Sequence, residues 1–289
     1  MQIIVYNGSV SLLLIQTSKA LSVTQERPFR IIQITDPHLL ADQKGVFAGL
    51  TTQNTFEQVL KKIKETYFPC DLIIATGDIV HNDAAEQTYK RFADAVSKLG
   101  IKTIVTPGNH DDAEILKKTL RNGLVTADKH YTAGKWQFFL LDSSVKNAVN
   151  GHLKEQELTE LEELLKKTPE YHTLIAMHHH PVSVGCRWLD MSGIDNGSRL
   201  MDMVEKYPNV KIIMWGHVHQ DFVSEKNKVN LVATPSTCIQ FKPKQVDFCL
   251  DRLPPGFRWL DLYNNGHAET GIVRLDELPT EIDFSTSGY

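Results

Sequence analysis

Five short apolar segments of this 289-residue chain each run directly into polar or charged side chains. Apolar runs of this length that end near Gly or Pro are typical of buried strands. The carboxyl ends of parallel strands meet at one edge of an α/β sheet, and ligands bind there. The five polar fragments are Asp36-Pro37-His38, Gly77-Asp78, Gly108-Asn109-His110-Asp111, His178 and Gly216-His217-Val218-His219. We therefore expect their side chains to converge on one site.

Helices and strands alternate along the chain up to residue 215. Apolar residues at helical spacing predict helices over 51–67, 84–99, 153–167 and 198–207. Continuous apolar runs predict strands over 29–35, 71–76, 101–105, 136–141, 173–177 and 210–215, and shorter strands near 221–224, 229–234, 257–263 and 268–274. This order predicts an α/β body with a mixed sheet and a β-rich C-terminal part packed on it.

The chain divides into one predicted domain and two terminal segments. Residues 29–275 form the domain, because no repeat, low-complexity tract or linker interrupts them. In the N-terminal extension, residues 1–28, Asn7-Gly8 separates two apolar runs and predicts a β-hairpin. That extension lacks the early positive charge of a targeting segment and the length of a membrane span. Residues 276–289 form a polar tail that we expect to fray.

Composition limits the partners of the protein. A net charge of −4 and a pI near 6.3 offer no general basic surface for nucleic acid. The four cysteines show neither the CxxC pairs of zinc sites nor a disulfide framework, which indicates reduced thiols. We therefore expect a cytoplasmic protein that binds neither nucleic acid nor a membrane.

The strand-end fragments contain two carboxylates, one carboxamide and four imidazoles that are candidate metal ligands. Oxygen donors mixed with imidazole suit Mn²⁺, Fe or Zn²⁺ rather than Ca²⁺, which takes oxygen ligands alone. Seven donors are too many for one tetrahedral ion, but they suit two ions that share a carboxylate. The seven are Asp36, His38, Asp78, Asn109, His178, His217 and His219.

In this order, the five fragments resemble the calcineurin-like metallophosphoesterase superfamily. Two further segments, Ala233–Cys238 (ATPSTC) and Gln240–Pro243 (QFKP), narrow the resemblance to the bacterial class III 3′,5′-cyclic AMP phosphodiesterases of the CpdA/Icc family. The resemblance covers roughly residues 29–265. It implies a layered αββα sandwich of two mostly mixed β-sheets flanked by helices.

The resemblance also implies how the ligands divide. One ion is expected on Asp36, His38, Asp78 and His219, and the other on Asp78, Asn109, His178 and His217, with Asp78 bridging. Asp36 and His38 are two residues apart, so an extended segment would point both side chains the same way. Iron, manganese or both are the ions expected, and zinc and cobalt are compatible with the same ligands.

The implied reaction is hydrolysis of 3′,5′-cyclic AMP to 5′-AMP, by in-line attack of a metal-bridging hydroxide. The residues expected to take part in catalysis are Asp78, Asn109 and His110, with His110 as acid or electrostatic partner for the leaving 3′-oxygen. Asn109, His110 and His180 are expected to contact the substrate. The partner is thus a small cyclic nucleotide, and both a monomer and a homodimer are compatible with the sequence.

Two rival functions remain open. A phosphatase or nuclease would use the same site on another ester, although the segment after Asp78 lacks the Arg of the protein phosphatases and no basic track for a nucleic acid is evident. A non-catalytic scaffold would have lost ligands, and none is missing here. For Trp188, Gln240 and Phe241 both base contact and packing are open. The histidines treated as ordinary polar residues are His81, His130, His152, His172 and His267.

Overall fold

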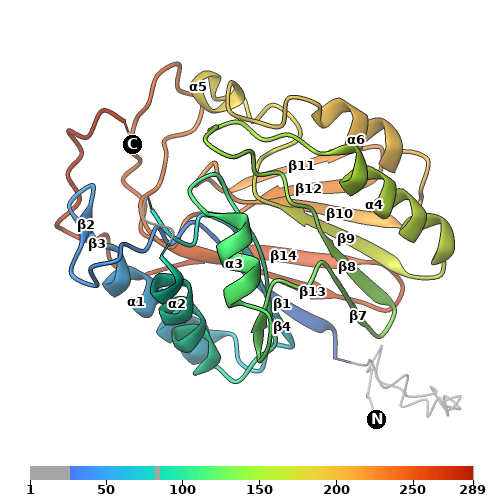
Figure 1. The fold of residues 1–289 in the computed structure, drawn as a ribbon, viewed down its shortest axis with the longest axis horizontal. Helices are drawn as coiled ribbons and strands as arrows, with labels where there is room; N and C mark the ends of the chain where they lie inside the picture. Colours follow the sequence, from blue (N-terminus) through green and yellow to red (C-terminus); the bar gives the residue numbers. More distant parts are fainter. Residues whose placement is uncertain (1–26, 82–84, 289) are drawn as a thin grey trace, which may run out of the picture.

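The computed structural model describes residues 27–81 and 85–288. The hairpin predicted around Asn7-Gly8 lies outside these residues. Two six-stranded mixed sheets form the centre of the molecule (Figure 1). In spatial order, the first contains β14 (Ala268–Arg274), β13 (Gly256–Leu262), β1 (Phe29–Ile34), β4 (Leu72–Thr76), β5 (Thr103–Thr106) and β6 (Val125–Thr126). The second contains β11 (Phe222–Lys226), β12 (Val229–Ala233), β10 (Val210–Trp215), β9 (His172–Met177), β8 (Trp136–Leu140) and β7 (His130–Ala133).

Helices cover the outer face of each sheet. The first sheet carries α1 (Thr52–Thr66), α2 (Glu86–Ser97) and α3 (Ala113–Thr119), and the second carries α4 (Glu155–Lys167), α5 (Arg187–Asp190) and α6 (Gly197–Val204). Phe56 and Phe92, from α1 and α2, share one core cluster with Ile73 of β4. Leu161 of α4 shares another with Trp215 of β10. The predicted αββα arrangement is therefore confirmed (Figure 1).

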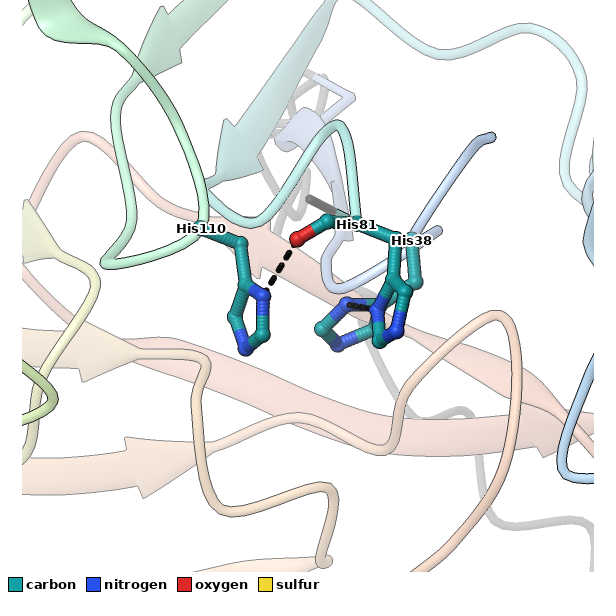
Figure 2. Close-up of side chains that lie close together, drawn as sticks. All are labelled: His38, His81 and His110. Atoms are coloured by element: carbon teal, nitrogen blue, oxygen red, sulfur yellow. Dashed lines mark hydrogen bonds between the residues drawn. The ribbon is translucent and has the colours of Figure 1, made fainter. Parts of the chain in front are cut away.

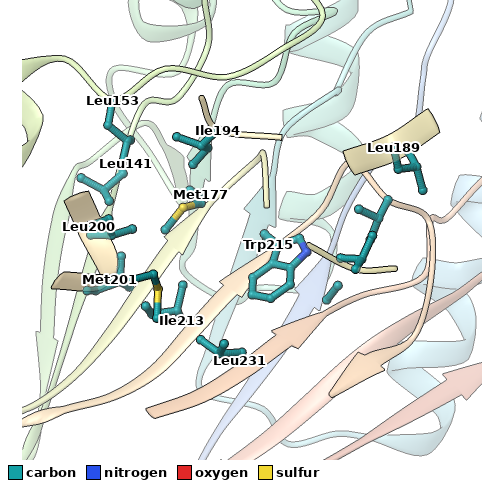
Figure 3. Packing of buried hydrophobic residues seen from close by; sticks show 14 of the residues in the cluster. Leu141, Leu153, Met177, Leu189, Ile194, Leu200, Met201, Ile213, Trp215 and Leu231 are labelled. Carbon is teal, nitrogen blue, oxygen red and sulfur yellow. The ribbon is translucent and has the colours of Figure 1, made fainter. Parts of the chain in front are cut away.

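Alternation of side chains along the strands builds this double sandwich. Ile31 and Ile74 lie between the two sheets, whereas their neighbours Ile32 and Ile73 face the helices. A strand buried on both faces reads as a continuous apolar run, as these segments do. On the outer face of the second sheet, Trp215 packs within a large aliphatic cluster that Figure 3 shows. Both sheets are thus held from two sides, which fixes the strand ends that carry the site.

The long predicted elements are present, and the differences lie in short or terminal ones. The sequence reading missed β6, β7, α5 and the small hairpin of β2 (Val46–Phe47) and β3 (Leu50–Thr51). It was also wrong about the described part of the tail. Ile282 is only 8% exposed, the amide of Asp283 donates to Ala48 O at 3.0 Å, and the Arg252 guanidinium lies 4.1 Å from the Phe284 ring centroid. These contacts fasten the tail beside the β2–β3 hairpin. Among the described residues, no helix combines the length and apolarity that a membrane crossing requires.

Candidate metal centre

The five polar fragments meet because they follow β1, β4, β5, β9 and β10 at the same edge of the sandwich. Backbone hydrogen bonds join the loops: Asp36 N donates to Gly77 O at 3.1 Å and His38 N to Asp78 O at 3.0 Å. The loops of the two sheets are joined as well, since the amide of His217 donates to Asp36 Oδ2 at 3.1 Å. A Cβ at Gly108 would lie 2.1 Å from Asp78 Oδ1, so only glycine allows the third loop to come this close.

Five of the candidate ligands have left-handed backbone conformations. The φ angles are 53° for Asp36, 47° for His38, 49° for Asp78, 63° for His217 and 49° for His219. Positive φ is uncommon for residues other than glycine and is found at strained turns near functional sites. The expected extended segment at Asp36–His38 is therefore wrong: each of these side chains is directed by a sharp bend of the backbone.

Three ligands form the first half of the site, and all are buried. His219 Nε2 lies 3.3 Å from Asp36 Oδ1 and 3.2 Å from His38 Nε2. His38 Nε2 is 3.9 Å from Asp78 Oδ2, which connects this group to the second half. One donor atom from each of Asp36, His38 and His219 lies within 4.8 Å of the others, a spacing that can hold a cation.

The second half contains Asp78, Asn109, His178 and His217. His178 Nε2 lies 3.2 Å from Asp78 Oδ2 and 3.1 Å from Asn109 Oδ1. The ring of His217 lies 5.1 Å from that of His178, centroid to centroid. Asp78 therefore stands between the two groups, with its Oδ2 facing a histidine of each.

Hydrogen bonds orient two of the candidate imidazole ligands, and burial keeps two others neutral. His178 Nδ1 donates to Thr76 O at 2.7 Å and His219 Nδ1 to Ile239 O at 2.9 Å, which directs Nε2 of each ring toward the carboxylates of the site. Burial lowers the pKa of His38 and of His217 well below the ordinary value. Both rings are therefore neutral, which is the form that binds metal.

The carboxylate between the two groups is ionised. Burial opposes ionisation, but the charges of His178 and His110 hold the pKa of Asp78 well below its usual range. Burial lowers the pKa of His178 too, yet the negative charges of Asp78 and Asp36 outweigh it and raise that pKa to about 9. A buried carboxylate thus attracts positive charge into the centre of the site.

Two orphaned atoms show that the site fits cations. Asp78 Oδ2 and His217 Nδ1 are buried and have no hydrogen-bond partner among the described residues. A buried polar atom without a partner is costly and calls for a ligand. Both atoms are lone-pair donors, and both belong to residues that the sequence reading assigned to metals. The donor set therefore fits two divalent ions that share Asp78.

His110 lies beside the metal ligands, together with a histidine that the sequence reading had treated as ordinary. His110 Nδ1 donates to the backbone carbonyl of His81, and the two rings stack 5.2 Å apart, centroid to centroid (Figure 2). His81 Nδ1 is 3.4 Å from His38 Nδ1. His81 follows Asp78 by only three residues, and this proximity was the available signal.

Asp111 does not orient the ring of His110. Its carboxylate accepts hydrogen bonds from the amides of Gly108 at 2.8 Å and of Ile79 at 3.2 Å, and from the hydroxyl of Tyr89 at 3.2 Å. Burial, with the charge of Asp78 adding to it, raises the pKa of Asp111 to about 7. The residue therefore ties together the loops that follow β4 and β5.

A cavity of about 970 Å³ opens onto Asn109, His110 and His217. Trp188 lies on its wall, and its ring centroid is 5.0 Å from that of Phe241 and 5.2 Å from that of Phe248. This position agrees both with contact to a base and with packing. His180 is not on the wall: it is 2% exposed and stacks against His217. In this structure His180 contacts a candidate ligand, and its contact with substrate stays a prediction.

The two segments that narrow the family resemblance, Ala233–Cys238 and Gln240–Pro243, contact the candidate ligands Asp36 and His219. Phe241 is 1% exposed and its ring stacks on that of His219 at 4.1 Å, centroid to centroid. Ser236 Oγ donates to Asp36 O at 2.7 Å, and Gln240 Nε2 donates to Ser236 O at 2.8 Å. Packing is therefore the role of Gln240 and Phe241 in this structure.

Comparison with known proteins agrees with this geometry. Residues 29–221 match the family model of the calcineurin-like phosphoesterases. The chain is 37% identical over 259 residues to the 3′,5′-cyclic adenosine monophosphate phosphodiesterase CpdA of Pseudomonas aeruginosa, covering 90% of this chain and 94% of that protein. It is 37% identical to CpdA of Escherichia coli K12, covering 93% and 98%. It is 38% identical to a 3′,5′-cyclic-nucleotide phosphodiesterase of Nostoc, covering 92% and 100%.

Solved structures share the fold at low identity. A dimetal phosphatase from Danio rerio aligns with a TM-score of 0.61 at 14% identity, over 82% of this chain and 94% of that one. A purple acid phosphatase from yellow lupin aligns with a TM-score of 0.57 at 14% identity, over 85% and 53%. Since the family model, the relatives and the fold agree, the chain belongs to the calcineurin-like phosphoesterase family and, within it, to the CpdA/Icc group of class III phosphodiesterases.

Proposed function

We propose that this protein hydrolyses 3′,5′-cyclic AMP to 5′-AMP with two divalent cations. The observation that carries the proposal is the buried Asp78 carboxylate, which stands between His38 and His178. The neighbouring residues Asn109 and His217 line an open cavity. Relatives that align over 90% or more of this chain bear the name of this activity. The same donor set suits iron and manganese, with zinc and cobalt also compatible.

Each cation has a complete set of donors in this proposal. Asp36, His38, Asp78 and His219 would hold the first ion, and Asp78, Asn109, His178 and His217 would hold the second. Two such ions supply an activated water and neutralise the charge that develops on the phosphoryl oxygens. Their charge exceeds that of the two carboxylates, so the base of the cavity attracts an anionic phosphodiester despite the net charge of the chain.

Two residues at the base of the cavity would act on the substrate itself. Asn109 has one amide oxygen near His178, and its NH₂ group is a donor suited to a phosphoryl oxygen. His110 donates through Nδ1 to the His81 carbonyl, and in this proposal its Nε2 delivers a proton to the departing 3′-oxygen. A proton is needed there because an alkoxide is a poor leaving group near neutral pH.

The cavity favours a small substrate over the rival substrates. Its wall combines the aromatic ring of Trp188 with polar groups, a composition that suits a nucleoside. The wall carries both acidic and basic side chains, among them Glu114 and Lys146, so it offers no continuous basic track for a nucleic acid. All four cysteines are free thiols, which agrees with the proposed cytoplasmic location.

A turnover panel tests the proposal. The metal-loaded chain should hydrolyse 3′,5′-cyclic AMP with Mn²⁺, Fe²⁺ or Co²⁺, and a chelator should abolish turnover. Phosphoserine peptides and supercoiled plasmid serve as the rival substrates. Absence of cyclic AMP hydrolysis under every ion, together with dephosphorylation or plasmid nicking, would replace the proposal with one of its rivals.

Replacement of Asn109 by alanine should affect metal and substrate together. Asn109→Ala removes both the donor near His178 and the amide on the cavity wall, so we expect weaker binding of one ion and a lower kcat/KM, by about 10²–10³-fold. Metal stoichiometry and steady-state kinetics measure the two effects. Asn122→Ala, which replaces an exposed residue between α3 and β6 that does not line the cavity, is the control. If Asn109→Ala lost turnover but bound both ions with wild-type affinity, Asn109 would contact the substrate and would not be a metal ligand.

A further inference from the structure

The first observation concerns the hydroxyl of Ser192, in the segment after α5. Ser192 Oγ lies 2.8 Å from Leu189 O and 2.9 Å from His217 Nε2. A hydroxyl has one hydrogen and two lone pairs. Its hydrogen must lie toward the Leu189 carbonyl, because an oxygen–oxygen contact of that length without a hydrogen is repulsive. The lone pair that remains accepts a hydrogen bond from Nε2–H of His217.

The hydrogen bond to Ser192 also determines which nitrogen of His217 can bind a metal ion. If Nε2 of His217 carries the proton of the neutral ring, Nδ1 carries the lone pair. His217 Nδ1 is the buried atom that has no partner among the described residues. His178 and His219 are held the other way round, with Nδ1 donating to a carbonyl. His217 therefore presents the opposite nitrogen to the centre, as a fixed acceptor can enforce.

Ser192 is itself held firmly. Leu189 is fully buried within the core cluster on the outer face of the second sheet, so its carbonyl is a fixed reference point. The amide of Ser192 also donates to Leu189 O at 2.8 Å. Beyond Ser192, Ile194 N donates to His180 O at 3.0 Å and pins the segment to the loop after β9. These bonds fix the backbone that carries the hydroxyl, and the bond to Leu189 O directs the hydroxyl itself.

We propose that Ser192 is a positioning residue that sets the tautomer of His217, so that Nδ1 is directed to the second metal ion. The proposal rests on the proposed ligand role of His217. It makes the segment after α5 part of the metal centre, although this segment lies inside the connection between β9 and β10 and not at a strand end. Ser192 and Trp188 line the same cavity, so one short segment contributes both to the wall and to the metal centre.

A pair of isosteric variants tests the hydroxyl alone. Ser192→Thr keeps the acceptor, whereas Ser192→Val has the shape of threonine without the hydroxyl. The full chain, stripped by chelation, is titrated with Mn²⁺ by calorimetry. Ser192→Val should bind one ion as wild type does and the other about 10–100-fold more weakly, while Ser192→Thr stays close to wild type. Ser183→Ala, which removes an exposed hydroxyl that donates to Asp190, is the matched control and should change neither ion.

A spectroscopic measurement on the wild-type chain tests the tautomer of His217 directly and requires no substitution. In the Zn²⁺-loaded wild-type chain, ¹⁵N shifts of labelled histidine should show His217 protonated on Nε2. Equal affinities for Ser192→Val and Ser192→Thr, or a proton on Nδ1 of His217, would overturn the inference. A wild-type chain that binds fewer than two ions would instead contradict the proposed function from which the inference starts.

Discussion

Asp78→Asn should remove most of the activity and at least one of the two ions. Asparagine keeps the shape of the side chain and tolerates positive φ, so the turn at φ 49° should persist. The Oδ1 that accepts from the amide of His110 at 2.9 Å can also persist. What disappears is the charge and the second oxygen shared by the two groups of ligands. We expect kcat to fall by about 10³-fold or more, at the upper end of what one fixed electrostatic contact contributes.

Metal content by mass spectrometry and kcat on cyclic AMP measure this result. Asp261→Asn is a suitable control, because Asp261 is also buried, at 6% exposure, but pairs with Arg30 at 2.6 Å outside the site. That control should lower thermal stability and retain both ions. If Asp78→Asn kept two ions and lost less than about tenfold in turnover, a bridging carboxylate would not be the basis of the centre.

His110→Ala should slow turnover while both ions stay bound. General acid catalysis contributes about 10²–10⁴-fold when the leaving group is a poor one. The 3′-alkoxide of cyclic AMP needs such a proton, whereas p-nitrophenolate leaves without one. The loss should therefore be large with cyclic AMP and below about tenfold with bis(p-nitrophenyl) phosphate. Since no ligand role is assigned to His110, the metal stoichiometry should match that of wild type.

His267→Ala, which removes an exposed histidine, is the control for this comparison. Its kinetics with both substrates should equal those of wild type. Equal losses of His110→Ala on the two phosphodiesters would remove the acid role and leave a general electrostatic one. A lost ion would instead place His110 among the ligands, beside His38 and His81 (Figure 2).

Sequence reasoning located the metal centre because strand ends and ligands coincide. Runs such as Ile31–Ile34 and Ile73–Thr76 are buried on both faces, so they had to be central strands whose ends share an edge. Once the strands are parallel neighbours, convergence of Asp36 and Asp78 follows from topology. The long helices followed from the same periodicities.

The features that the sequence did not predict depend on loop geometry, which the spacing of apolar residues does not indicate. Ser192 reaches His217 because a four-residue helix turns the chain over a buried leucine, and neither α5 nor that contact has a sequence pattern. The polar composition of the tail concealed Ile282 and Phe284, whose burial depends on partners distant in sequence. The bends at Asp36 and His38 are likewise imposed by neighbouring loops.

The left-handed residues of the metal centre bear on the scaffold alternative. A non-glycine residue at positive φ destabilises the fold by on the order of 1 kcal/mol or more, and five candidate ligands are in this state. In a chain that only had to keep its shape, glycine at these bends would relieve the strain at once. Ion binding at the proposed centre would offset this strain, so glycine at one of these bends should stabilise the fold while it removes a ligand.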